Sequence, residues 1–146
     1  MNIEVRRAIA DDADELIALN RESDVDGEIS LDPDSVRRSI TDESTERVFV
    51  AELQERLVGF ATVQITRSFC YTRPTAELTE LFVRPEQRRL GTASKLVAAI
   101  ISDIEIENCL ELFLRVNHVN IGAISFYERN GFSQADHYEY RIKYYV

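Results

Sequence analysis

The sequence predicts an α/β fold with a mixed, mostly antiparallel central sheet of six to seven strands and about four helices on both faces. Three observations predict it. Short apolar runs of strand length recur along the chain, apolar residues over 93–104 follow a helical period, and no repeat or linker interrupts the 146 residues. A chain of this length fits one domain, so we expect a single domain over residues 1–146.

The N-terminal third of the sequence predicts one strand and two helices. Residues 3–5 alternate apolar and polar side chains, as a strand does. Asp11 and Asp12 are N-cap candidates for the helix that follows. A polar, acidic stretch over 23–34 is expected to be a loop, and it leads into a short helix around residues 36–40.

The rest of the chain continues as an alternation of strands and helices. The strand–helix–strand unit in its middle should be a right-handed parallel crossover. The expected elements are a buried hairpin of strands 48–51 and 58–65, a strand over 78–83, a helix over 93–104, a strand over 110–116, a helix from Asn120 to Gly131, and a long final strand over 136–146.

The net charge of −9 is confined to the N-terminal part of the chain. Residues 1–60 hold 16 acidic and 7 basic side chains, whereas residues 61–146 hold 10 of each. Binding to nucleic acid depends on Lys and Arg that neutralise phosphates, so this distribution argues against a nucleic-acid partner. It favours a cationic partner, or it only keeps the protein in solution.

The two cysteines, Cys70 and Cys109, have neither CxxC spacing nor a nearby pair of histidines, so we expect no metal site and no disulfide framework. The longest apolar run, over 96–101, is too short to cross a bilayer, and the start of the chain has no apolar signal region. We therefore expect no membrane association and a cytoplasmic protein.

A basic turn between the strand over 78–83 and the next helix has the features of an anion site. The first amides of a helix lack intrahelical acceptors, and the macrodipole adds positive charge there. Arg88 and Arg89 supply charge, while Gly91 and Ala93 leave the backbone uncovered. The turn lacks the Lys-Ser or Lys-Thr of a nucleotide P-loop and the three glycines of a dinucleotide fingerprint.

This turn resembles the pyrophosphate motif Q/R-x-x-G-x-G/A of the GNAT superfamily of acyl-CoA-dependent N-acetyltransferases, and Val83-Arg84-Pro85 matches the Val-x-Pro that precedes it. The resemblance implies a single-domain GNAT-like fold and acetyl-CoA as the acyl donor. It also implies that the turn amides contact the pyrophosphate and that the strand edge binds pantetheine. The implied binding residues are Leu81, Phe82, Val83, Arg88, Arg89, Leu90, Gly91, Thr92, Ala93 and Ser94.

A second segment is similar to the family's other motif, N-x-x-A-x-x-x-Y-x-x-x-G-F, through Asn120, Ala123, Tyr127, Gly131 and Phe132. The resemblance implies that Asn120 both caps its helix and faces the cofactor. It also implies that the Tyr127 hydroxyl lies near the cofactor sulfur, where a phenol can protonate the leaving thiolate. The alternative for Tyr127 is core packing.

Amine acetylation needs a base, because an amine with a pKa of about 10 is protonated at neutral pH. The resemblance implies a carboxylate on the strand before the turn, and Glu80 and Glu77 are the candidates. They fall on opposite faces of a regular strand, so only one faces the acceptor unless the strand is bulged. Many family members carry Glu at the position of Thr79. We favour Glu80 as the base, and the alternative for Glu80 is a role in an ion pair. An amide near Leu81 or Phe82 would stabilise the thioester oxygen.

The acceptor is expected to be a small cationic amine, such as an aminoglycoside or a polyamine, bound by an acidic rim that includes Asp24, Asp26 and Glu28. This segment hints at a calcium loop but lacks the full ligand pattern. No cysteine lies in either motif, so we expect direct attack in a ternary complex. Alternatives are acetylation of a protein N-terminus or lysine, and a non-catalytic acyl-CoA-binding module. The aromatic final strand suggests a homodimer.

Overall fold

The computed structural model describes residues 2–23, 31–42 and 46–144. The chain forms two compact units, Met1–Arg115 and Val116–Val146. Among these described residues, the first unit contains a five-stranded sheet and three α-helices, and the second contains one α-helix.

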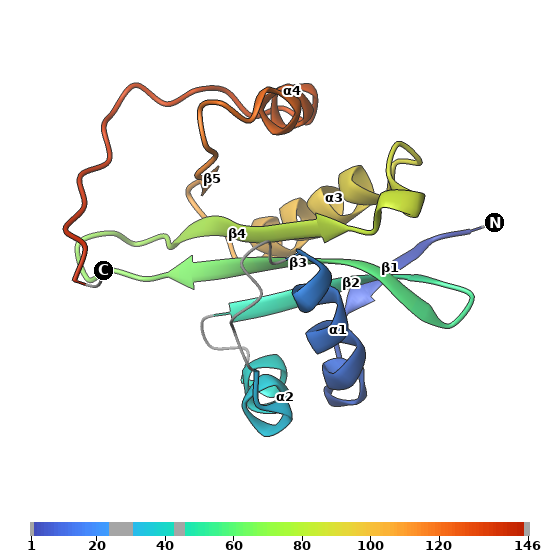
Figure 1. Ribbon diagram of the computed structural model, residues 1–146. Coiled ribbons are helices and arrows are strands. Elements are labelled where there is room, and N and C mark those ends of the chain that lie inside the picture. The colour runs from blue at the N-terminus through green and yellow to red at the C-terminus, as the bar shows by residue number, and fades with distance from the viewer. Residues whose placement is uncertain (1, 24–30, 43–45, 145–146) are drawn as a thin grey trace. The chain divides into compact units, whose positions relative to one another are not determined.

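The sheet is mixed and mostly antiparallel, as the sequence predicts (Figure 1). Its strands lie in chain order, and the first four run antiparallel to one another in sequence. The last strand runs parallel to the fourth, because helix α3 (Thr92–Ile106) connects them as a crossover. The strands are β1 (Glu4–Arg7), β2 (Glu46–Leu53), β3 (Arg56–Thr66), β4 (Thr75–Val83) and β5 (Leu112–Leu114).

One face of the sheet is covered by α1 (Ala13–Ser23) and α2 (Pro33–Thr41), and we call it the α1–α2 face (Figure 1). Its core combines Leu16 and Leu19 of α1 with strand residues such as Val50. Helix α2 begins earlier than the sequence predicts, since the predicted loop extended to residue 34. The Asp32 carboxylate caps α2 by accepting hydrogen bonds from the amides of residues 34 and 35.

The opposite face of the sheet is covered by α3, whose helical period the sequence predicts correctly. Leu96, Val97 and Ile100 of this 15-residue helix are fully buried. Arg47 of β2 connects the helix to the sheet through two ion pairs. It pairs with Asp103 at 2.7 Å and with Glu107, one turn further along the chain, at 2.6 Å. Within the described segments, no helix combines the length and the apolar character that a membrane span requires.

An ion network fixes the entry into α1. Arg6 donates two hydrogen bonds to Asp12 at 2.8 and 2.9 Å and also pairs with Glu52 of β2 at 2.8 Å. Asp12, predicted as an N-cap, lies in the short 3-10 turn Ala10–Asp12 and accepts the Ile9 amide at 2.8 Å. Burial raises the pKa of Asp12, but the hydrogen bonds from Arg6 and Ile9 outweigh it and leave this pKa below the ordinary value.

The predicted final strand is wrong over the residues that the structure describes. Residues 136–144 have no strand pairing there, so the sheet has five strands rather than six to seven. Tyr138, Tyr140 and Tyr144 are accordingly 86–90% exposed. Alternation of apolar and charged side chains fits a strand, but a strand also needs a neighbour that accepts its backbone hydrogen bonds, and the pattern alone does not supply one. The predicted homodimer, which rested on these residues, stays a prediction.

The second unit is organised around α4 (Ile121–Arg129). Asn120 is its N-cap and accepts the Ala123 amide at 3.2 Å, as predicted. Gly131 follows the helix with φ +95°, which confirms it as the residue that ends the helix. The Tyr127 ring packs edge-on against Phe132, with ring centroids 5.7 Å apart.

Candidate active site

The second half of β4 presents an open backbone edge on the side of β5. β5 pairs with β4 only over residues 76–78, whereas β4 continues to Val83. The Arg84 amide donates to β3 at 2.9 Å. Because consecutive residues of a strand direct their amides to opposite sides, the Phe82 amide also points to β3 and those of Leu81 and Val83 point to the open edge. An extended, amide-containing ligand can pair with this edge.

The turn that follows β4 presents a row of unused donors. Gly91 is the N-cap residue of α3 at φ +82°, and Arg89 also has a left-handed backbone at φ +65°. The amides of residues 89–94 donate no hydrogen bond within the part of the chain that the structure describes. They stand at the positive end of the α3 dipole, so the turn has the chemistry of a phosphate site. A Cβ added at Gly91 would meet no atom within 4 Å, which leaves room for a bulky anion.

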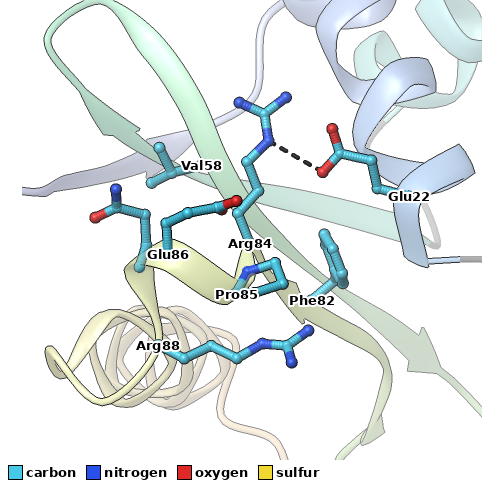
Figure 2. A pocket seen from close by; sticks show the side chains of 8 residues that line it. Glu22, Val58, Phe82, Arg84, Pro85, Glu86 and Arg88 are labelled. Atoms are coloured by element: carbon cyan, nitrogen blue, oxygen red, sulfur yellow. Dashed lines mark hydrogen bonds and ion pairs between the residues drawn. The ribbon is translucent and has the colours of Figure 1, made fainter.

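The Arg88 side chain connects the turn to the end of β4. Its Nε donates to the Val83 carbonyl at 2.9 Å, and its guanidinium carbon lies 5.8 Å from the centroid of the Phe82 ring. Arg88 and Phe82 both line the pocket that Figure 2 shows. On the α1–α2 face, a hollow of about 660 Å³ adjoins the turn, and an ion pair of 3.1 Å between Arg84 and Glu22 of α1 borders it (Figure 2). A phosphate contact by the Arg88 side chain stays a prediction.

A β-bulge interrupts β4 between the two candidate bases. The sequence alone does not determine whether this strand is regular or bulged. Thr62 of β3 pairs with Glu80, but the next β3 residue pairs with Leu78, so Thr79 is an extra residue. The Thr79 hydroxyl bonds the Thr62 hydroxyl at 2.6 Å. The bulge therefore holds Thr79 and Glu80 together opposite one β3 residue.

The bulge brings both candidate bases to the same face of the sheet. Glu80 lies opposite Thr62, and Glu77 lies opposite Gln64, two residues along β3. Directly paired residues share a face of the sheet, so both carboxylates lie on the same face. Phe82, two residues after Glu80, packs against the core that includes α1, so this is the α1–α2 face. In a regular strand, their spacing of three would have separated them.

The two carboxylates differ in their surroundings. Glu77 accepts a hydrogen bond from Arg115 at 2.7 Å and is only 19% exposed, so its charge is matched. Glu80 is more exposed, and no described cation pairs with it. Partial burial, followed by the negative charge of Glu46, raises the pKa of Glu80 above its usual value. A carboxylate with a raised pKa is a better proton acceptor, which favours Glu80 as the base.

Other residues of the sequence hypothesis fall in different parts of the chain. Asn120 and Tyr127 belong to the second unit. Asp24, Asp26 and Glu28, predicted to bind the acceptor, lie outside the described residues.

Sequence reasoning missed a polar row on the α1–α2 face. Glu46, the first residue of β2, lies opposite Gln64 and accepts hydrogen bonds from Gln64 at 3.0 Å and from Ser39 of α2 at 2.7 Å. Alternation along β2 predicts the face of Glu46. The register that brings it near Glu80 depends on two hairpins and a bulge, which the sequence pattern does not reveal.

The comparisons with known proteins agree with this geometry. The model of the acetyltransferase (GNAT) family matches residues 13–132. The chain therefore belongs to the GNAT acetyltransferase family, and the resemblance inferred from the two motifs is confirmed.

Two curated relatives match over part of their length. The chain is 26% identical to human N-acetyltransferase 8 over 110 residues, which cover 75% of this chain and 48% of that protein. It is 29% identical to the ribosomal protein bS18-alanine N-acetyltransferase of Escherichia coli K12 over 96 residues, which cover 62% of this chain and 65% of that enzyme. The chain thus spans less than two thirds of either relative.

Solved structures support the fold over the whole chain. The acetyltransferase AAC(6')-Iy, in complex with a CoA bisubstrate analogue, has a TM-score of 0.86 at 19% identity and covers 99% of both chains. An aminoglycoside acetyltransferase from a soil metagenomic sample, in complex with trehalose, has a TM-score of 0.82 at 23% identity, with 97% of both chains covered.

Proposed function

We propose that the chain is an acetyl-CoA-dependent N-acetyltransferase that acts on a primary amine. The observation that carries the proposal is a continuous surface of backbone N–H groups without hydrogen-bond acceptors among the described residues, which we call the donor surface. The open amides of Leu81 and Val83 lead into the free amides of residues 89–94. Coenzyme A has this sequence of groups, since pantetheine carries amides and a pyrophosphate follows. The family match across 13–132 includes parts of both units, which supports a single acetyltransferase domain over 1–146.

Acetyl-CoA, the acyl donor, would be held by backbone amides rather than by a few side chains. The amides of residues 89–94 would bind the pyrophosphate, and the amides of Leu81 and Val83 would bind pantetheine carbonyls or the thioester oxygen. The Phe82 amide points to β3 and is the weaker candidate for the oxygen. Asn120, which belongs to the second unit, is the remaining residue predicted to contact the cofactor.

In the proposed reaction, Glu80 removes a proton from the acceptor amine, directly or through water. The amine nitrogen then bonds the acyl carbon as the carbon–sulfur bond breaks, and the leaving thiolate takes a proton from Tyr127. The second proton of the amine nitrogen returns to the Tyr127 phenolate, directly or through water, and Glu80 releases its proton to solvent. Glu77 is the second candidate base, and its carboxylate is engaged in an ion pair with Arg115 at 2.7 Å. Burial raises the pKa of the Cys109 thiol, which makes it a poor nucleophile and supports direct transfer.

A small cationic acceptor fits the charges around Glu80. Glu46, Glu77 and Glu80 share the α1–α2 face, and carboxylates attract ammonium groups. The aminoglycoside acetyltransferases among the structural neighbours are consistent with an acceptor of this class. The predicted rim of Asp24, Asp26 and Glu28 would extend the same negative surface.

A protein N-terminus is the second candidate acceptor. The relative from E. coli that shares 29% identity is a ribosomal-protein alanine N-acetyltransferase, and so is a structural neighbour from Brucella melitensis with a TM-score of 0.83 at 18% identity. Its 99% coverage of this chain supports the same fold.

The test is a panel of amines incubated with the protein and acetyl-CoA, with thiol release followed and products weighed by mass spectrometry. The panel contains aminoglycosides, polyamines, and short peptides that begin with alanine or carry lysine. Acetylation of one class, lost in Tyr127→Phe and Glu80→Gln, supports the proposal and selects the acceptor. Coenzyme A binding without acetylation of any amine would favour the non-catalytic module, and an acetylated protein trapped with acetyl-CoA alone would overturn direct transfer.

A further inference from the structure

Glu46 reaches the neighbourhood of Glu80 through the register of three strands. Glu46 and Glu77 flank Gln64 on β3, and Glu80 lies opposite Thr62 on the same face. Strands about 4.8 Å apart and a two-residue offset of about 6.8 Å place the Glu46 and Glu80 backbones about 12 Å apart on one face of the sheet. The electrostatic effect of Glu46 on Glu80 is consistent with this placement.

The charge of Glu46 is held without a described counter-ion. Its two carboxylate oxygens accept hydrogen bonds from Ser39 at 2.7 Å and Gln64 at 3.0 Å, and both donors are neutral. These bonds fix the side chain on the α1–α2 face. Glu77 differs, because Arg115 matches its charge at 2.7 Å.

The remaining charged groups around this face are already engaged with other partners. Arg38 of α2, which lines a hollow together with Asp42 and Glu46, donates to the Ser35 hydroxyl at 2.9 Å. On the far side of Glu80, Arg84 pairs with Glu22 of α1, and Arg88 bonds the end of β4. Glu46 is thus the described carboxylate on this face whose two oxygens accept hydrogen bonds from neutral donors.

We infer that Glu46 is a positioning residue for proton transfer: Ser39 and Gln64 hold its negative charge on the same face of the sheet as Glu80, where that charge helps Glu80 to act as the base. The inference rests on the proposed function of Glu80. It agrees with the raised pKa of Glu80, for which burial is the first cause and Glu46 the second. A base gains efficiency as its pKa approaches the working pH, so the charge of Glu46 has a catalytic consequence without contact with the substrate.

The experiment compares pH profiles of kcat/KM for the protein and three variants. Glu46→Gln removes the charge and keeps an acceptor for Ser39, whereas Glu46→Asp keeps the charge. Glu105→Gln removes one negative charge from an exposed position on α3 and is the matched control. We expect Glu46→Gln to move the acid limb to lower pH and to reduce the plateau roughly two- to five-fold, while Glu46→Asp and Glu105→Gln follow the parent protein.

Two further measurements keep the inference testable whatever the variants do. Raising the ionic strength of the unmodified protein to about 1 M should also move its acid limb to lower pH, since salt screens charges that are not in contact. A carbon-13 NMR titration of the Glu80 carboxyl in the parent protein and Glu46→Gln needs no activity, so it separates this inference from the proposed function. An unchanged Glu80 titration, or a Glu46→Gln variant that only raises the acceptor KM, would overturn the inference.

Discussion

Gly91→Ala separates the two roles that the structure gives to the residue before α3. Gly91 has φ +82°, and an added Cβ would meet no atom within 4 Å, so the cost is backbone strain rather than a clash. A left-handed conformation costs an L-residue roughly 1–2 kcal/mol. For a domain of this size, that loss lowers Tm by roughly 2–8 °C in thermal unfolding without ligand. Gly131, at φ +95° and equally open, supplies a matched control in Gly131→Ala.

The second role of Gly91 is to keep the row of free amides open to an anion. The Cβ of Gly91→Ala would enter the open space beside those amides and hold a phosphate away from one or two of them. Each lost hydrogen bond to a charged group is worth about 1.5–3 kcal/mol, so the Kd for coenzyme A should rise at least about ten-fold. Titration calorimetry with coenzyme A measures it.

The comparison of the two glycine variants decides between strain and binding. Both should lose similar stability, because both place an alanine in the left-handed region. Only Gly91→Ala should also lose affinity for coenzyme A. A folded Gly91→Ala variant that binds coenzyme A within two-fold of the parent protein would refute the assignment of residues 89–94 to the pyrophosphate.

Three other substitutions test the fold that supports the site. Arg6→Gln should cost about 1–3 kcal/mol in denaturant unfolding at pH 7, less than a fully buried pair would, because Arg6 is 31% exposed. The folded pKa of Asp12 is lowered, so this difference should shrink as the pH falls below about 4, and a pH-independent difference would contradict the ion-pair account. Gly59→Ala should cost about 1–3 kcal/mol, since its Cβ would lie 2.8 Å from the Phe82 carbonyl, and an unchanged Tm would show that the strands separate freely. Asn120→Ala should lower stability by about 1 kcal/mol through the lost cap, whereas Asn120→Asp should not.

The features that the sequence predicts correctly are those encoded within short stretches of chain. The turn around Gly91 follows from a glycine at a helix start, and the cap at Asn120 follows from a side chain and an amide three residues apart. The helix over 92–106 follows from its apolar period. Each depends on neighbours in sequence, so a single sequence contains enough information to predict it.

The features that the sequence does not predict depend on contacts between distant segments. Glu46 approaches Glu80 across two hairpins, and Arg115, which pairs with Glu77, comes from beyond a crossover helix. The failed prediction of a strand over 136–146 has the same origin. Its alternation is real, but pairing is a property of two segments, and the described residues 136–144 have no partner strand.

The bulge at Thr79 is a case in which a local sequence pattern and the pairing of distant strands together determine the site. Glu77 and Glu80 are three residues apart, so a regular strand would place one of them beneath α3 and the other beneath α1 and α2. One extra residue reverses the alternation and gathers both carboxylates on the α1–α2 face, while Leu81 and Val83 still direct their amides to the open edge. The same extra residue therefore sets the relation between the base and the donor surface. A chain without it could keep every motif residue and still lack the arrangement that the proposed reaction requires.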